Sequence, residues 1–149
     1  MKYISTRGQT EPMDFSDVLL MGLAPDGGLM LPEHYPTVAS DVLEEWRHLS
    51  YTDLALAIMQ RFATDIPYAD LKDIIDRTYT KEVFGDSDIV PVRKLEDNLY
   101  ILGLSNGPTL AFKDVAMQFL GNAFEYVLKR QDARITIIGA TSGDTGSAA

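Results

Sequence analysis

The sequence has 149 residues, 46% of them hydrophobic, so the chain is long enough and apolar enough to bury a core. Its formal net charge of −9 argues against nucleic acid and against an anionic membrane surface as partners, because both select for basic patches. The absence of cysteine excludes disulfides and thiolate chemistry and is typical of a cytoplasmic protein, and neither a membrane-length apolar run, a signal peptide nor a histidine cluster for a metal is present.

The N-terminal region predicts short strands, one helix and a tight turn. Residues 1–9 begin as an edge strand or an extended arm. Apolar residues recur at helical spacing over 15–22, so a short helix should end at Gly22. Residues 25–28 have the composition of a turn, and a short buried strand should follow over 29–31. The paired glycines do not form a P-loop, because no helix start with a Lys-Ser or Lys-Thr pair follows them.

Three helices are predicted in the next part of the chain. The first covers 40–49 with Ser40 as its cap, the second is capped by Ser50 or Thr52, and the third begins near Pro67. The residues expected to face the core are Val42, Leu43, Trp46, Leu54, Ile58, Met59, Phe62, Leu71, Ile74, Ile75, Thr78 and, at the margin, Val83.

A polar turn at 85–88 marks the expected boundary between two domains. Two β-rich runs follow at 89–95 and 99–104, joined by a short polar connection that is typical of a hairpin. We therefore expect a mostly helical N-terminal domain at 1–88 and the start of an α/β domain at 89–149.

A long helix is predicted over 110–129. The Gly107-Pro108 pair breaks the preceding structure, and Thr109 is a plausible cap. The expected polar stripe of this helix is formed by Asp114, Gln118, Gly121, Asn122, Glu125 and Lys129, and the opposite side includes Ala123 and Val127.

Lys113 lies outside this polar stripe. At 100° per residue it is roughly 130° from the centre of the stripe, in line with Met117, Leu120 and Phe124. Burial and the positive end of the helix dipole would both favour a neutral amine, which is a nucleophile. The alternative is that the lysine extends along its aliphatic stem to the surface.

The C-terminal part of the sequence predicts a strand at 134–139, which runs into a loop of small residues and a helix that begins near Gly146. Such a loop presents hydroxyl and N–H groups to an anion, here Ser142, Thr145 and the amides around Gly143 and Gly146. It could equally be an ordinary loop in which Asp144 or Thr145 caps the next helix. A domain rarely stops at the first turn of a helix, so we expect the sequence to be the N-terminal portion of a longer, truncated protein.

Three separate stretches resemble one enzyme family in the same order along the chain. GPTLAFKD, which contains Lys113, resembles the cofactor-lysine segment of the threonine synthases, pyridoxal-phosphate enzymes similar to the tryptophan synthase β subunit. GLAPDGGLMLPE, together with residues 3–8, resembles their N-terminal signature, and TSGDTG resembles their substrate-carboxylate loop. Two positions depart from some members, which carry His in place of Asn106 and Asn in place of Asp144.

The resemblance implies an α/β protein whose second part begins a fold type II, tryptophan synthase β-like domain. It implies that Lys113 holds pyridoxal 5′-phosphate covalently and acts as the catalytic base, and that Asp144 approaches the phenolic oxygen of the cofactor. The substrate-binding residues that the resemblance implies are Thr141, Ser142, Gly143, Asp144 and Thr145.

The implied reaction converts O-phospho-L-homoserine and water into L-threonine and phosphate. One alternative is a related phospho-lyase that stops after elimination. The other is that this polypeptide is an inactive module that packs on a partner.

Overall fold

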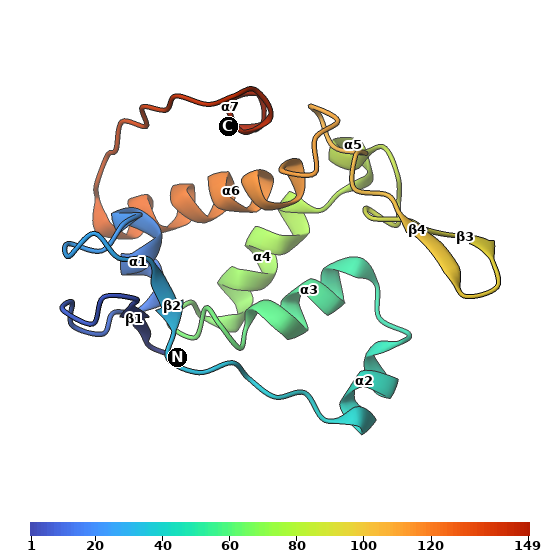
Figure 1. Ribbon diagram of the computed structural model, residues 1–149, viewed down its shortest axis with the longest axis horizontal. Coiled ribbons are helices and arrows are strands. Elements are labelled where there is room, and N and C mark those ends of the chain that lie inside the picture. Colours follow the sequence, from blue (N-terminus) through green and yellow to red (C-terminus); the bar gives the residue numbers. More distant parts are fainter. The chain divides into compact units, whose positions relative to one another are not determined.

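The computed structural model describes residues 1–149 and has an α/β fold with two compact units, Met1–Lys72 and Asp73–Ala149 (Figure 1). The domain boundary expected after residue 88 is a different division of the chain and stays a prediction. The first unit contains β1 (Tyr3–Ser5), α1 (Phe15–Met21), β2 (Met30–Pro32), α2 (Ser40–Trp46) and α3 (Tyr51–Met59), and α4 (Tyr68–Thr78) spans the division. The second unit contains α5 (Lys81–Phe84), β3 (Val92–Glu96), β4 (Leu99–Leu102), α6 (Asp114–Gln131) and α7 (Asp144–Ala148).

The N-terminal strands form a small antiparallel sheet that is organised by one carboxylate. β1 pairs with β2 so that Ser5 lies opposite Met30. The Asp26 carboxylate accepts hydrogen bonds from the Ser5 hydroxyl (2.7 Å), the Gly28 amide (2.9 Å) and the Gln9 amide (3.0 Å). The Ser5 hydrogen bond and these amides lower the pKa of Asp26 to about 2. The prediction of a tight turn at 25–28 is therefore confirmed.

The helices of the first unit confirm the predicted elements but not every predicted core position. Ser50 caps α3 by accepting from the Asp53 amide at 3.1 Å. α2 begins at Ser40, so its cap is Ala39 and the prediction for Ser40 was wrong by one position. Leu43 and Ile58 were expected in the core and are 53% and 41% exposed, whereas the buried residue of α3 is Leu56. Helical spacing identifies a face, but it does not determine which part of that face another element covers.

α4 confirms the strongest of the predicted core patterns. Leu71, Ile74 and Ile75 are completely buried, and Thr78 is buried with its hydroxyl donating to the carbonyl of Ile74 at 2.7 Å. Threonine is tolerated at this buried position because the hydrogen bond to Ile74 satisfies its hydroxyl donor within the helix.

The second unit is built around α6, the 18-residue helix drawn in orange in Figure 1. Its Ala123 and Val127 are buried as predicted. The Asn122 amide donates to the Thr78 hydroxyl at 3.0 Å, and the Tyr79 hydroxyl donates to the carbonyl of Val115 at the same distance. These bonds link the start and middle of α6 to the end of α4.

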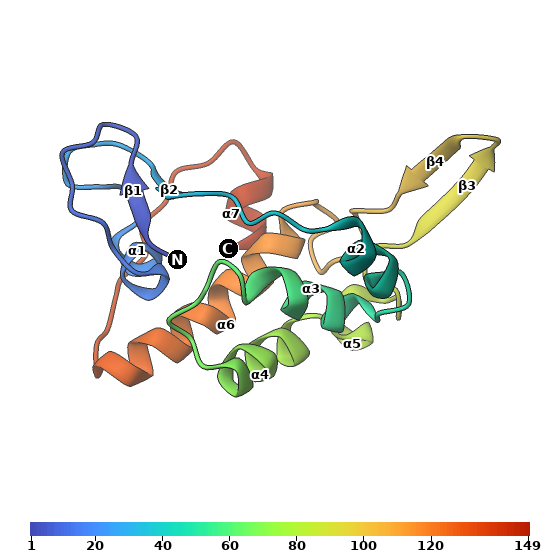
Figure 2. The same cartoon turned by 90° about the horizontal axis from the view of Figure 1, so that it is seen from below.

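The predicted hairpin is confirmed, and the predicted strand after α6 is not. β3 and β4 pair antiparallel as a two-stranded ribbon in which every strand residue is exposed (Figure 2). Residues 134–139 form no strand, and Ile138 is 91% exposed. A strand needs a neighbour to satisfy its N–H and C=O groups, and nothing pairs with this segment. No helix of the structure combines the length and apolar character that crossing a membrane requires.

Candidate functional site

The segment before α6 is a series of tight turns and not the first turns of a helix. α6 begins at Asp114, so the helix predicted from residue 110 starts four positions later than expected. Leu110 has a φ of 60°, in the left-handed region, which a right-handed helix cannot contain. Thr109 was expected to cap the helix, but its hydroxyl donates a hydrogen bond and accepts none from the helix. The sequence predicted too early a start for α6 because the apolar residues of the preceding loop also recur, by chance, at helical spacing.

Asp114 closes these turns by reaching back along the chain. Its two carboxylate oxygens accept from the Thr109 amide at 2.9 Å and from the Thr109 hydroxyl at 2.7 Å. The side chain is fully buried, so its predicted place in the polar stripe was wrong. The reason is local: the carboxylate is turned toward the loop, whose amide and hydroxyl replace water as its partners.

Gly107 makes this closure possible. A Cβ atom at position 107 would lie 2.4 Å from the Cβ of Asp114 and 2.5 Å from one of its oxygens. No side chain fits into that space. The GPTLAFKD string is therefore a structural unit in which residues 107, 109 and 114 fix one another.

Lys113 is the last residue before α6 and is half-buried. Its carbonyl accepts from the amides of Ala116 and Met117, which ties the residue to the start of the helix. Its amine lies 4.8 Å from the centre of the Phe112 ring, where the electron-rich face of the ring attracts a cation. Phe112 and Leu110 are 58% and 72% exposed, so the lysine lies beside an exposed apolar rim.

A cavity of ≈ 580 Å³ lies along the same side of α6. The α6 residues that line it are Met117, Leu120, Gly121 and Phe124, which follow Lys113 at intervals of four, seven, eight and eleven positions. This agrees with the predicted row of residues in line with the lysine, although Gly121 was assigned to the polar stripe. The other lining residues are Ile137, Gly139, Thr141, Thr145, Gly146 and Ala149.

The loop of small residues forms the opposite wall of this cavity, and α7 contacts α6. The hydroxyl oxygen of Thr141 accepts from the amides of Gly146 (3.0 Å) and Gly143 (3.3 Å). α7 begins at Asp144 with Gly143 at its cap position and no side-chain cap, so neither Asp144 nor Thr145 caps it. Thr141 takes that role because its hydroxyl faces the free amides at the start of the helix.

The predicted site residues are thus only partly gathered. Thr141 and Thr145 line the cavity, while Ser142, Gly143 and Asp144 do not and are exposed. The lysine itself is not among the lining residues. Asp114 and Gly107 are two further residues of this segment that the sequence did not predict as parts of the site. The features that could have indicated them are an aspartate directly after the lysine and a glycine six positions before it.

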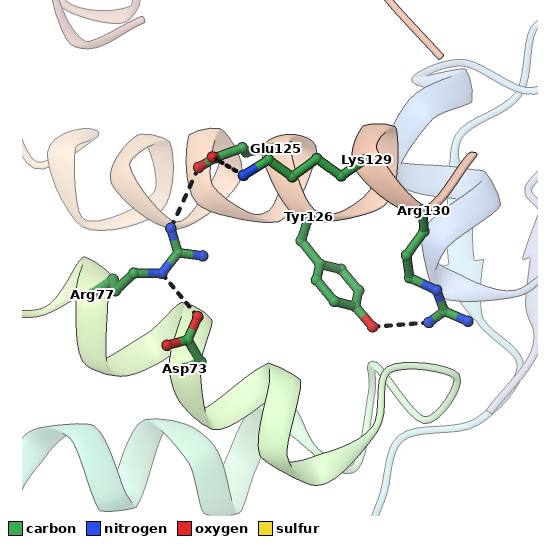
Figure 3. A pocket seen from close by; sticks show the side chains of 6 residues that line it. All are labelled: Asp73, Arg77, Glu125, Tyr126, Lys129 and Arg130. Atoms are coloured by element: carbon green, nitrogen blue, oxygen red, sulfur yellow. Dashed lines mark hydrogen bonds and ion pairs between the residues drawn. The ribbon is translucent and has the colours of Figure 1, made fainter. Parts of the chain in front are cut away.

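A second cavity of ≈ 560 Å³ lies between the C-terminal part of α4 and α6, and Figure 3 shows the charged side chains around it. Arg77 pairs with Asp73 at 3.0 Å and with Glu125 at 3.4 Å, and Glu125 also pairs with Lys129 at 2.6 Å. Lys129 first, and then Arg77, hold the pKa of Glu125 below its usual range. These exposed charges satisfy one another and are typical of a solvated helix surface. No group of three or more His, Asp or Glu side chains is placed to hold a metal ion.

Comparisons with known proteins place the chain among named relatives. A family model described as threonine synthase N terminus matches residues 2–79. A threonine synthase of Methylobacillus glycogenes is 57% identical over the whole chain, and one of Corynebacterium glutamicum is 53% identical over the whole chain. The chain spans 33% and 32% of these two proteins, which is about a third of the length of the curated relatives it matches.

A solved threonine synthase structure is also similar to this chain in three dimensions. The crystal structure of PLP-bound threonine synthase from Brucella melitensis matches 99% of this chain with a TM-score of 0.93 and 46% identity. The match covers 32% of that protein. The α/β fold described above is therefore that of the corresponding third of a threonine synthase structure.

Proposed function

Because the chain belongs to the threonine synthase N-terminus family, we propose that it is part of an enzyme that makes L-threonine and phosphate from O-phospho-L-homoserine and water. The proposed cofactor is pyridoxal 5′-phosphate. One structural observation carries the proposal: Lys113 precedes by one turn the row of α6 residues that faces the small-residue loop across a cavity. The proposed chemistry requires two features of the chain, a nucleophilic amine to hold the cofactor and a loop that binds anionic groups.

The residues present fit the proposed cofactor. Lys113 offers an amine that can bond to an aldehyde carbon with loss of one water. Met117 and Phe124 offer an apolar wall, and the hydroxyls of Thr141 and Thr145 and the amides of the loop offer hydrogen bonds to anionic groups. A cavity of ≈ 580 Å³ is also within the range of small-ligand sites.

In this reaction pyridoxal phosphate supplies an electron sink for the carbon skeleton of the substrate. Lys113 would hold the cofactor through its amine and would also be the base that moves protons at the α and β carbons of the substrate. The loop residues proposed to bind the substrate carboxylate are Thr141, Ser142, Gly143, Asp144 and Thr145. Thr141 and Thr145 would do so from the cavity wall, whereas Ser142, Gly143 and Asp144 would have to turn toward it. Asp144, an exposed residue at the start of α7, would be the residue that faces the phenolic oxygen of the cofactor.

The same proposal covers the organisation of the chain. Residues 1–88 form the N-terminal domain, and residues 89–149 contribute to a cofactor-binding domain of fold type II. In support, the family model ends at residue 79, and Lys113 and the small-residue loop both follow it. A cytoplasmic location is proposed because the sequence has no cysteine to exploit an oxidising compartment.

The test is an absorbance spectrum of the purified protein after incubation with pyridoxal phosphate and removal of the excess. We expect a band for covalently held cofactor that Lys113→Ala abolishes. Lys129→Ala is the matched control, since Lys129 is an exposed lysine of α6, the helix that Lys113 directly precedes. A band that survives in Lys113→Ala would contradict the proposed attachment site. Release of a keto acid in place of threonine from O-phospho-L-homoserine would identify the phospho-lyase alternative.

A further inference from the structure

Asp114 is a buried carboxylate that the proposed reaction does not use. It directly follows Lys113 and is the first residue of α6, yet it has no exposed surface. An acidic residue in the first turn of a helix usually faces the free N–H groups of that turn. Here both oxygens are turned the other way and accept from the amide and hydroxyl of Thr109.

This arrangement encloses Lys113 within a fixed turn. Thr109 and Asp114 are the two ends of a six-residue segment, and the two hydrogen bonds of 2.9 and 2.7 Å hold these ends together. The segment contains Leu110 at a φ of 60°, a strained conformation for a leucine that persists only where surrounding contacts impose it. The Asp114–Thr109 bonds supply that constraint.

The packing at Gly107 restricts the aspartate from the other side. The position that a Cβ of residue 107 would take is already filled by the Asp114 side chain, at 2.4 to 2.7 Å. The contact with Gly107 on one side and the hydrogen bonds to Thr109 on the other therefore restrict the position of the Asp114 carboxylate. Because the backbone of Lys113 lies inside this closed turn, the direction in which its side chain leaves the chain is fixed as well.

We propose that Asp114 is a positioning residue for Lys113: by bonding to Thr109 it holds the lysine segment in the conformation in which the amine can attach the cofactor. The inference rests on the proposed function. It assigns to Asp114 no contact with substrate or cofactor, so Asp114 acts only through the lysine.

The experiment compares Asp114→Asn and Thr109→Val with wild type in the full-length polypeptide. Asparagine keeps the shape but has only one acceptor oxygen, and valine removes only the hydroxyl donor. Glu125→Gln is the matched control, because it neutralises an exposed carboxylate on the same helix. Thr109→Ser keeps the hydroxyl and should behave as wild type.

Two measurements are made on each variant. The first is amide hydrogen exchange of Gly107 and residues 109–113 without cofactor, where we expect roughly tenfold faster exchange in Asp114→Asn, the cost of losing a hydrogen bond to a charged group. The second is the rate at which pyridoxal phosphate becomes bonded to Lys113, trapped by borohydride and located by peptide mass. We expect this rate to fall roughly tenfold in Asp114→Asn and Thr109→Val, for the same reason. Combining both changes should slow attachment by less than the product of the two single effects, because both variants weaken the same contact between Asp114 and Thr109.

The outcomes separate this proposal from the function on which it rests. Faster exchange with slower attachment supports the positioning role. Faster exchange with an unchanged attachment rate overturns it, because the bonds would then only stabilise the fold. Unchanged exchange also overturns it. If wild type itself attaches no cofactor at Lys113, the proposed function fails first and the positioning role falls with it, and this result is visible without any variant.

Discussion

The chain contains two turns that are organised in the same way and placed in different surroundings. At the N-terminus, the Asp26 carboxylate accepts from a hydroxyl and from backbone amides beside a glycine that has no room for a Cβ. Before α6, the Asp114 carboxylate accepts from a hydroxyl and an amide beside Gly107, which also has no room. The first turn joins the stretch that contains Ser5 and Gln9 to the turn at 25–28. The second encloses a lysine.

The difference between these turns shows why a motif of this type cannot be interpreted from its residues alone. Asp26 keeps part of its surface in water, whereas Asp114 has none. A partner lost at the buried site leaves a polar group without water to replace it, while solvent can compensate at the exposed site. Only the second turn contains a lysine, Lys113, so only there would a rigid turn also serve the proposed chemistry.

The comparison of the two turns predicts the largest loss of stability when a methyl group is added to the glycine of each turn. Gly107→Ala places a Cβ 2.4 Å from the Cβ of Asp114, an atom held by the helix backbone, and we expect a loss of about 3 kcal/mol in the free energy of unfolding. Gly28→Ala meets the Ser5 hydroxyl at 2.2 Å, which can rotate away, so a loss of about 1–2 kcal/mol is expected.

Denaturant titration followed by circular dichroism measures the change at Gly107. Fluorescence suits the change at Gly28, since the single tryptophan, Trp46, lies in the first unit. A greater loss for Gly28→Ala than for Gly107→Ala would show that the mobility of the atom that the new Cβ meets is not what separates the two turns.

A smaller effect of opposite sign is expected at a glycine with open space around it. Nothing lies within 4 Å of a Cβ built at Gly121, in the middle of α6. Gly121→Ala should therefore raise the free energy of unfolding by about 1 kcal/mol, the difference in helix propensity. Ala116→Gly, at an exposed position of the same helix, should lower it by a similar amount. If Gly121→Ala destabilises the protein, the steric interpretation of the other two glycines is also in doubt.

The smallest effect concerns pH and the exposed turn. The pKa of Asp26 falls from 3.8 to about 2 on folding, chiefly through the Ser5 hydroxyl. A carboxyl with a lowered pKa stabilises the fold above pH 3.8, and this contribution is lost as the pH falls toward 2. Wild type should therefore lose its stability advantage over Asp26→Asn across that range, as measured by unfolding at a series of pH values. A constant difference between the two proteins from pH 5 to pH 2 would contradict the assigned cause.

Much of the fold could be predicted because the signals are local. The caps and turns at Ser50, Gly22 and 25–28 depend on neighbours a few positions away, and the structure places them as expected. The core face of α4 was also predictable, because its apolar residues are dense and regularly spaced. The exposed Leu43 shows that apolar spacing alone does not predict burial. Spacing assigned it to the inner face of α2, but no other element covers that position.

The residues of the candidate site stay a prediction, and the structure tests only the geometry around them. Lys113 and the small-residue loop stand out by residue type, and the structure places the loop against the row of α6 residues that follows the lysine. The helix start at 110 and the strand at 134–139 were wrong. Leu110 takes a left-handed conformation that no propensity predicts, and a strand depends on a neighbour that local sequence does not contain.

The sequence by itself therefore determined the turns and most of the helices and indicated Lys113 as the candidate reactive side chain, because these depend on residue type and on spacing along the chain. Only the tertiary structure decided what surrounds them. Helical periodicity puts Asp114 on a polar stripe, yet the loop before α6 folds back and supplies Thr109 as its partner in a buried position. That outcome depends on two hydrogen bonds and on the missing Cβ of Gly107, which act together only once the chain has closed on itself.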